Sequence, residues 1–384
     1  PAMKRVVVIG GGVVGASAAF HLARGGVESI LVDRKDTGHA TGAGAGIISP
    51  GTSTRPLPAF FPFAQAAVNH YPVMVSQLAE IGQATTRYEV VGELILAKTD
   101  EEFANLPVLK ALYAERRAGG MPNIGEVTDV DEATAKELFP ALGPIHGALH
   151  VPEAARVDGD SLRNALVAGA EYHNAGIRYG AASLKTERDR VVGVDLDGES
   201  IEADGVIVAT GAWTNALLTP VGFSVAVEPQ RGQILHIEMG DTDTSRWPIL
   251  GGTGEQYMLT FRPNRIVSGA TRETGSGFDV QLTVGGLQSV FNHAMRVAPG
   301  VAQGTVKEIR IGLRPLSNDG LPYLGRIPGH DNVVLATGHG PSGLQLGPYS
   351  GVIAAQLLLG EEVTTDLSAF AVDRDPGQNT YSGH

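Results

Sequence analysis

A glycine-rich turn close to the N-terminus constrains the fold more than any other feature of this sequence. The short apolar run at residues 5–9 is bounded by glycine, as a buried parallel strand is, and GGGVVG follows it at residues 10–15. A helix-forming stretch, ASAAFHLARGG, comes next, and a second apolar run then ends in Asp33. This order of strand, glycine turn, helix, strand and acid predicts a dinucleotide-binding βαβ unit.

Three glycines of the turn have separate tasks in such a unit. Gly10 permits the turn, Gly12 lets the backbone approach a pyrophosphate, and Gly15 allows close packing of helix against strand. The phosphates then lie at the N-terminus of the helix, where unpaired N–H groups and the helix dipole favour negative charge.

Asp33 stands at the end of the second strand, 18 residues after Gly15, where it can accept hydrogen bonds from a ribose diol. The negative charge of Asp33 also disfavours a dinucleotide with a phosphate on the 2′-oxygen of this ribose. The alternative is a glycine-rich turn followed by an exposed aspartate with no ligand. The further contacts that we expect from this unit are Val13, Val14 and Arg34.

Composition places the chain among folded globular proteins. A length of 384 residues predicts two or three domains, and 43% hydrophobic against 18% charged residues excludes wholesale disorder. The 51 glycines are nearly twice the usual share of roughly 7%. Because they follow no Gly-X-Y period, they indicate tight turns and close backbone approach to a ligand.

Charge and cysteine content exclude several classes of protein. A net charge of −12 with no basic run argues against nucleic-acid binding. The absence of cysteine excludes disulfides, thiolate zinc sites, a cysteine nucleophile and a cysteinyl cofactor bond. The longest stretch without Asp, Glu, Lys or Arg, residues 332–360, contains His339 and two prolines, so we expect no membrane span and a cytoplasmic location.

The pattern along the chain predicts an α/β fold: a Rossmann-like dinucleotide domain with a second α+β domain built on a mostly antiparallel sheet. Amphipathic helices are expected within residues 88–142, and strands around one helix within 228–310. Another helix should begin at Asp160 as its N-cap. We assign residues 1–87, 143–225 and 310–384 to the discontinuous dinucleotide domain, and residues 88–142 and 226–309 to the substrate domain.

Five segments carry a family resemblance in the same order as the family's motifs. They are a small-residue loop at residues 40–47, VIVATGAW at 206–213, YMLTFRPNRIVSGATRE at 257–273, GLRPLSNDGLPYLGR at 312–326 and GHGPSGLQLGP at 338–348. Together they resemble the D-amino acid oxidase superfamily of FAD oxidoreductases, particularly the glycine oxidases and their sarcosine oxidase relatives. The likeness runs nearly end to end.

The resemblance implies that FAD is the dinucleotide. The implied contacts are Thr41, Gly42, Gly46 and Ile47 in the small-residue loop, Ala209, Gly211 and Trp213 in the second segment, and Gly340, Ser342, Gly343, Leu344 and Gln345 at the last turn and helix. This chain departs from the family at Ala43, where many relatives carry a basic or histidine residue, and at Pro341, where glycine oxidase has arginine. Since Ala43 cannot form a covalent link and the chain has no cysteine, non-covalent FAD is expected.

Two residues are candidates for holding the substrate. The resemblance places Arg314 of the GLRP segment at the arginine that binds the substrate carboxylate, and a planar guanidinium can do so with two parallel hydrogen bonds. Tyr257 matches the tyrosine that hydrogen-bonds the same carboxylate. The alternatives are a structural ion pair for Arg314 and an ordinary half-buried strand residue for Tyr257.

Other candidates for chemistry are weaker. We do not expect His339 to be a general base, because the family does not use the histidine of this turn as one. No HxH or HExxH spacing predicts a metal site. Ser161, Ser268 and Ser342 lack a nucleophile-elbow context. Phe60, Phe61 and Phe63, among prolines, are expected to form a packed loop.

The expected activity is oxidation of the C–N bond of a small amino acid, such as a D-amino acid, glycine or an N-methylated glycine, to an imine by hydride transfer to flavin N5. The electron acceptor is O₂ or another acceptor, and a homo-oligomer is compatible with the sequence. An NAD-dependent Rossmann dehydrogenase and a non-catalytic flavin-binding protein are the alternatives.

Overall fold

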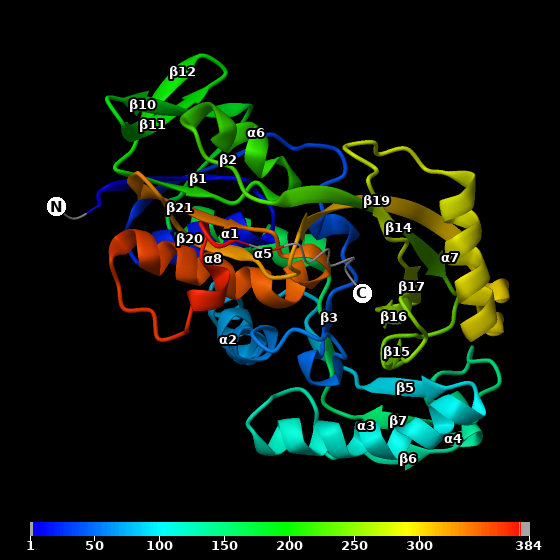
Figure 1. The fold of residues 1–384 in the computed structure, drawn as a ribbon. Coiled ribbons are helices and arrows are strands. Elements are labelled where there is room, and N and C mark those ends of the chain that lie inside the picture. The colour runs from blue at the N-terminus through cyan, green and yellow to red at the C-terminus, as the bar shows by residue number, and fades with distance from the viewer. Residues whose placement is uncertain (1–2, 376, 378–384) are drawn as a thin grey trace.

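The computed structural model describes residues 3–375 and 377, and two large sheets dominate it (Figure 1). The first is six-stranded, in the order β20–β21–β13–β1–β2–β9. Its strands are β1 (Arg5–Ile9), β2 (Glu28–Asp33), β9 (Gly176–Tyr179), β13 (Gly205–Val208), β20 (Tyr323–Ile327) and β21 (His330–Thr337). All neighbours are parallel except β20 and β21, so this sheet is the expected dinucleotide-binding one.

Both faces of the six-stranded sheet are covered, which explains why β1 is continuously apolar. Val6 and Val8 join the core formed with helices α1 (Val13–Arg24), α5 (Gly159–Tyr172) and α8 (Gly343–Leu359). Val7 and Ile9 face the other way, toward a three-stranded sheet and a short helix. These elements are β10 (Ala182–Glu187), β11 (Arg190–Leu196), β12 (Glu199–Glu202) and α6 (Thr214–Leu218).

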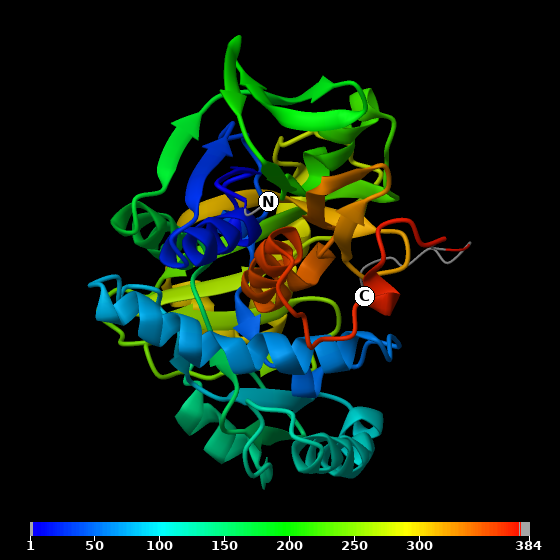
Figure 2. The ribbon, with the colours of Figure 1, turned by 90° about the vertical axis from the view of Figure 1, so that its left-hand side faces the viewer.

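The long helix α2 (Phe60–Glu80) corrects one expectation, since Phe60, Phe61 and Phe63 lie in its first turns and not in a loop. Proline is tolerated at the start of a helix, where its missing N–H has no intrahelical partner, so Pro62 does not stop this one. A stripe of buried side chains runs along α2 at helical spacing and packs on the helical layer. Figure 2 shows α2 crossing the molecule between α8 and the cyan segment that holds α3.

The second sheet is nine-stranded and mostly antiparallel, and only β5 and β15 pair in parallel. Its main path is β18–β14–β17–β16–β15–β5–β7–β6, with β19 on β14. The strands are β5 (Glu93–Ala97), β6 (Thr128–Val130), β7 (Gly147–Val151), β14 (Val227–Glu238), β15 (Ile249–Gly251), β16 (Tyr257–Phe261), β17 (Arg265–Gly269), β18 (Glu273–Thr274) and β19 (Thr305–Ser317). Helices α3 (Asp100–Ala118), α4 (Glu132–Leu138) and α7 (Val284–Val297) accompany this sheet.

Two features join the sheets. A small sheet is formed by β3 (Ile47–Ile48), β8 (Ala155–Arg156) and β4 (Glu89–Val90). These strands belong to the segments of chain that run from one large sheet to the other. Strand β19 begins in the nine-stranded sheet, pairs with β14 over most of its length, and ends beside the turn before α8, where Leu316 forms a bridge to His339. Residues near the end of β19 are therefore carried from the larger sheet to the edge of the dinucleotide-binding sheet.

The predicted fold class is confirmed, whereas the division into two domains stays a prediction. Strand β7 falls within the range 143–225 that we assigned to the dinucleotide domain, yet it pairs with β5 of the larger sheet. The N-cap of α5 is Asp158 and not Asp160, since the Asp158 carboxylate accepts the N–H of Ser161 at 2.8 Å. No helix among the described residues is long and apolar enough to cross a membrane, and the cytoplasmic location stays a prediction.

Candidate active site

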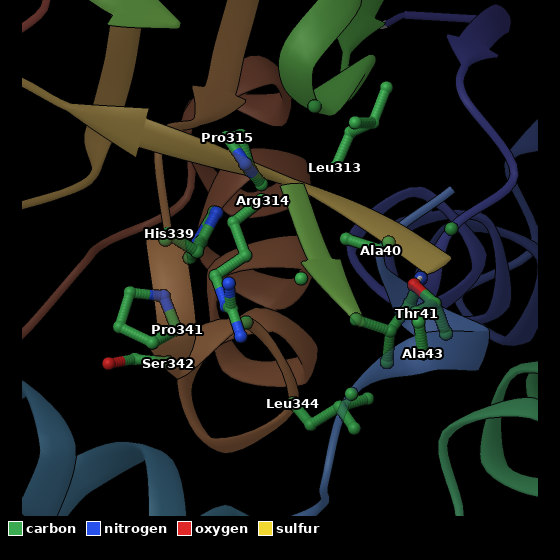
Figure 3. Close-up of a pocket in the computed structure, with 18 of the residues that line it drawn as sticks. Ala40, Thr41, Ala43, Leu313, Arg314, Pro315, His339, Pro341, Ser342 and Leu344 are labelled. Carbon is green, nitrogen blue, oxygen red and sulfur yellow. Dashed lines mark hydrogen bonds between the residues drawn. The ribbon is translucent and has the colours of Figure 1, made fainter. Parts of the chain in front are cut away.

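A cavity of about 500 Å³ lies between the two sheets and joins the predicted dinucleotide residues to the predicted substrate residues. Every residue that we predicted for cofactor or substrate lines it, except Gly15 and Gly42. Figure 3 shows Arg314 extending from β19 between the turn of His339, Pro341 and Ser342 and the segment that holds Ala40, Thr41 and Ala43. Residues far apart in sequence are thus brought to one site.

The glycine turn has the geometry that a pyrophosphate site needs. Gly10 has a φ of 107°, and a Cβ there would overlap the carbonyl oxygen of Ala209. A Cβ on Gly15 would overlap the carbonyl oxygen of Gly10, which explains why Gly15 packs the turn without lining the cavity. The N-cap of α1 is Gly12, which has no side chain to cap the helix. Backbone groups therefore border the cavity at this helix N-terminus.

Asp33 lines the cavity at the end of β2 and is held by a residue that we did not predict. Arg163 of α5 donates from Nη2 to the Asp33 carboxylate at 3.2 Å and from Nε to the Gly11 carbonyl at 2.6 Å. It therefore ties the acid to the glycine turn. Only the position of Arg163 on the helix after Asp158 hinted at this in the sequence, because its partners are more than 100 residues away.

The small-residue loop approaches the same helix N-terminus. Thr41, in a short 3₁₀ turn (Thr41–Ala43), accepts the N–H of Val13 on its Oγ1 at 3.0 Å. Gly42 is turned away from the cavity, because a Cβ there would meet Asp160 Oδ1 at 2.6 Å and its carbonyl accepts from Arg310 at 2.8 Å. The loop is therefore anchored on one side and open to the cavity on the other.

The N-terminus of α8 also opens on the cavity without a side-chain cap. A Cβ built on Gly343 would meet no atom closer than 3.9 Å, so there is open space at this end of the helix. His339 also lines the cavity; its Nε2 lies 2.8 Å from Ser350 Oγ, and burial lowers its pKa to about 4. That His339 is not the general base stays a prediction.

Arg314 is half-buried, and the strand opposite leaves space for it. A Cβ on Gly232 of β14 would lie 2.7 Å from the Arg314 guanidinium, so only glycine fits there without displacement. Arg314 Nη1 donates to the carbonyl oxygen of Thr271 at 3.0 Å. Tyr257 is its neighbour in the cavity; burial raises the pKa of Tyr257, and the nearby charge of Arg314 opposes that rise. Arg314 and Tyr257 are thus brought together.

Glu93 is a buried acid at the cavity wall that the sequence analysis missed. It is 5% exposed, and its Oε2 accepts hydrogen bonds from Ser49 at 2.8 Å and Thr52 at 2.9 Å. Burial raises the pKa of Glu93 to about 7, although both hydrogen bonds oppose the rise. Its sequence context, an acid at the start of the apolar run ELILA, is the signal that could have identified it.

The described residues fit a bound dinucleotide. Two helix N-termini whose own N-cap residues supply no side-chain hydrogen bond, the acid at the end of β2 and the glycines of the turn all border one cavity. At Gly211 a Cβ would meet nothing within 4 Å, so the cavity wall leaves room there as well. No group of three or more His, Cys, Asp or Glu able to hold a metal ion occurs among the residues described.

The comparison with protein families decides which dinucleotide is used. Residues 5–357 match the DAO family model, described as FAD dependent oxidoreductase. The chain belongs to this family. FAD is therefore the cofactor, and the nicotinamide alternative is set aside.

Relatives of this DAO-family protein match it over almost its whole length. An uncharacterized oxidoreductase of Bacillus subtilis, YurR, is 38% identical and covers 96% of this chain and 98% of its own. A glycine oxidase of Pseudomonas putida is 30% identical, with 96% and 98% covered. Among solved structures, iminodiacetate oxidase from Chelativorans sp. BNC1 aligns with a TM-score of 0.92 at 35% identity, covering 96% of this chain and 99% of that one.

Proposed function

We propose that this DAO-family oxidoreductase oxidises the C–N bond of a small amino acid, of the D-amino acid, glycine or N-substituted glycine type. The observation that carries the proposal is the position of Arg314 and Tyr257 in the same cavity as the glycine turn and the N-terminus of α8. The relatives named glycine oxidase and iminodiacetate oxidase support it, because both named compounds carry a carboxylate next to a C–N bond.

Arg314 would bind the substrate carboxylate. Its guanidinium stays charged. Nη1 donates to the Thr271 carbonyl oxygen at 3.0 Å and contacts Gln230 Oε1 at 3.5 Å, and the side chain is also hydrogen-bonded to Tyr257. A guanidinium has five N–H donors, so donors remain for an anion. The Tyr257 hydroxyl can donate a further hydrogen bond to the same carboxylate. Fixing this group orients the substrate Cα, so a diffusive encounter becomes an oriented one.

FAD would be held without a covalent bond by the glycine turn, Asp33 and the N-terminus of α8. The chemistry that it supplies when bound is two-electron oxidation of the C–N bond to an imine by hydride transfer to flavin N5, and the imine then hydrolyses. The N–H groups at the start of α8 would stabilise negative charge on a bound ring without a charged side chain. No dedicated acid or base is required of the protein, since the neutral amine supplies the electron pair.

An anaerobic spectrum tests the proposal and separates it from a non-catalytic flavoprotein. The purified yellow holoenzyme is mixed with a panel of D-amino acids, glycine and N-substituted glycines without oxygen. We expect the flavin band to bleach with at least one of them. A flavin that stays oxidised with every amine tested would leave the chain a flavin-binding protein only.

A further inference from the structure

A second guanidinium, that of Arg272, lies in the same cavity as Arg314 and has no part in the reaction described so far. Arg272 sits in the short connection between β17 and β18. Its Nε and Nη1 atoms are buried and have no hydrogen-bond partner among the described residues. Its Nη2 makes only a long contact, 3.5 Å, with the carbonyl oxygen of Glu255.

Arg272 is close enough to the carboxylate-binding pair to affect its ionisation. Burial lowers the pKa of Arg314, and the charge of Arg272 lowers it further. Burial raises the pKa of Tyr257, and Arg314 and then Arg272 oppose that rise. The two guanidinium groups and the phenol therefore form one electrostatic unit at the substrate end of the cavity.

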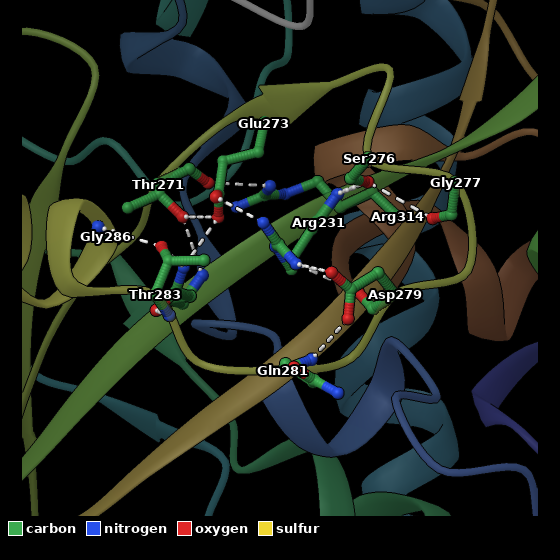
Figure 4. A network of polar contacts seen from close by, with 11 residues as sticks. Arg231, Thr271, Glu273, Ser276, Gly277, Asp279, Gln281, Thr283, Gly286 and Arg314 are labelled. Atoms are coloured by element: carbon green, nitrogen blue, oxygen red, sulfur yellow. Dashed lines mark hydrogen bonds and ion pairs between the residues drawn. The ribbon is translucent and has the colours of Figure 1, made fainter.

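The acid next to Arg272 in sequence does not neutralise it. The Glu273 carboxylate accepts from Arg231 at 3.0 Å, from Gln233 at 3.0 Å and from Thr271 at 2.7 Å, and Figure 4 shows it within this network. Arg231 also pairs with Asp279 at 2.9 Å. The polar network behind the site thus satisfies Glu273 and Arg231 and leaves Arg272 without a carboxylate of its own there.

Arg272 is half-buried, and leaving its buried Nε and Nη1 donors without hydrogen bonds is costly unless a ligand supplies them. Four arginines line the cavity, of which Arg34 pairs with Asp36 and Arg55 donates to Ser342. The other two, Arg314 and Arg272, neighbour Tyr257, and a carboxylate bound by Arg314 leaves Arg272 without an anionic partner. Glu93 borders the same cavity, but its carboxylate is hydrogen-bonded to Ser49 and Thr52. A ligand with two carboxylates completes the site.

We propose that Arg272 binds a second carboxylate of the substrate, so that the preferred substrates are amines with two carboxylates. The second carboxylate can be on the nitrogen substituent, as in iminodiacetate, or on the side chain, as in D-aspartate. This inference rests on the proposed function. It adds that a matching monocarboxylate is disfavoured because it leaves the buried Nε and Nη1 donors of Arg272 without a partner.

The first test uses the holoenzyme and matched substrates. Iminodiacetate has a second carboxylate where N-ethylglycine has a methyl group. D-aspartate has a side-chain carboxylate that D-alanine lacks. We expect kcat/KM to be higher for the dicarboxylate of at least one pair by roughly 30-fold, as for a buried charge-assisted contact. The pair that shows the preference tells which position the second carboxylate occupies. Equal or higher values for both monocarboxylates would overturn the inference.

The second test changes the residue. Arg272→Met should lower kcat/KM for the preferred dicarboxylate by roughly 30-fold, mostly through KM, and leave the matched monocarboxylate within about threefold. Arg272→Lys keeps the charge without the planar fork, so it should restore part of the loss. Arg117→Met, at an exposed arginine near the end of α3 and outside the cavity lining, is the control and should change neither substrate.

A binding measurement removes the dependence on turnover. Malonate or succinate, titrated calorimetrically against the flavin-loaded protein, should bind more tightly than acetate in the wild type and lose that advantage in Arg272→Met. An equal loss for dicarboxylates and acetate would make Arg272 a structural residue and overturn the inference. If the inference fails, bleaching of the flavin by a monocarboxylic amine in the anaerobic spectrum would still uphold the proposed function. No bleaching with any amine would remove both the proposed function and the inference.

Discussion

Glu93 makes the folded protein sensitive to pH, and the size of the effect follows from its burial. Its pKa is raised from 4.5 to about 7 in the folded state. Because the folded state holds this proton more tightly, the stabilisation is complete below pH 4.5 and is lost as the pH rises through 7. A shift of about 2.5 pH units at 1.36 kcal/mol each corresponds to about 3 kcal/mol in the free energy of unfolding.

Glu93→Gln tests this reasoning. The amide oxygen can still accept from Ser49 and Thr52, but the side chain no longer titrates. Urea unfolding at saturating FAD between pH 5 and pH 8.5 should show the wild type losing about 3 kcal/mol relative to the variant as the pH rises. Glu126→Gln, at an exposed glutamate outside the cavity lining, should follow the wild type at every pH. A wild-type minus Glu93→Gln difference that is independent of pH would refute the reasoning.

Three further predictions concern other parts of the site. Arg314→Ala should weaken binding of a carboxylate inhibitor by roughly 2 to 5 kcal/mol, measured by titration, while flavin content stays unchanged. Gly15→Ala should lose FAD on gel filtration, because its Cβ overlaps the Gly10 carbonyl, whereas Gly285→Ala, with open space around it and no positive φ, should keep FAD. Asp158→Ala removes the cap of α5 and the carboxylate that pairs with Arg265, so urea unfolding should show a loss of about 3 to 5 kcal/mol.

The fold was predictable where local pattern and chemistry agree. The strand–glycine–helix order at the N-terminus marked β1 and α1, and the final helix was marked by its apolar run and Gly360. Helix α2 was missed because its prolines suggested a loop, although Pro62 falls where a helix tolerates it. The N-cap of α5 was placed two residues late, since both Asp158 and Asp160 are good caps and only the hydrogen bond to Ser161 distinguishes them.

The site was predictable where a backbone requirement or a family motif marks it, and not where burial decides. Glycines at the turn and Arg314 in GLRP are visible in the sequence. Glu93 and Arg272 look like ordinary charged residues near strand ends, and their importance follows from their long-range environment. Arg163 contacts a turn 152 positions away, which no local pattern reveals.

The long pairing of β14 with β19 has a consequence for how substrate and coenzyme are aligned. Arg314 lies two residues before Leu316, which bridges to the turn at His339, so a single stretch of chain sets the spacing between Arg314 and the turn before α8. Under the proposed function, this continuous strand pairing would align substrate and coenzyme without a closing movement of the two sheets. If Arg314 binds the substrate carboxylate as proposed, residues of neighbouring strands can change substrate selectivity without changing this spacing.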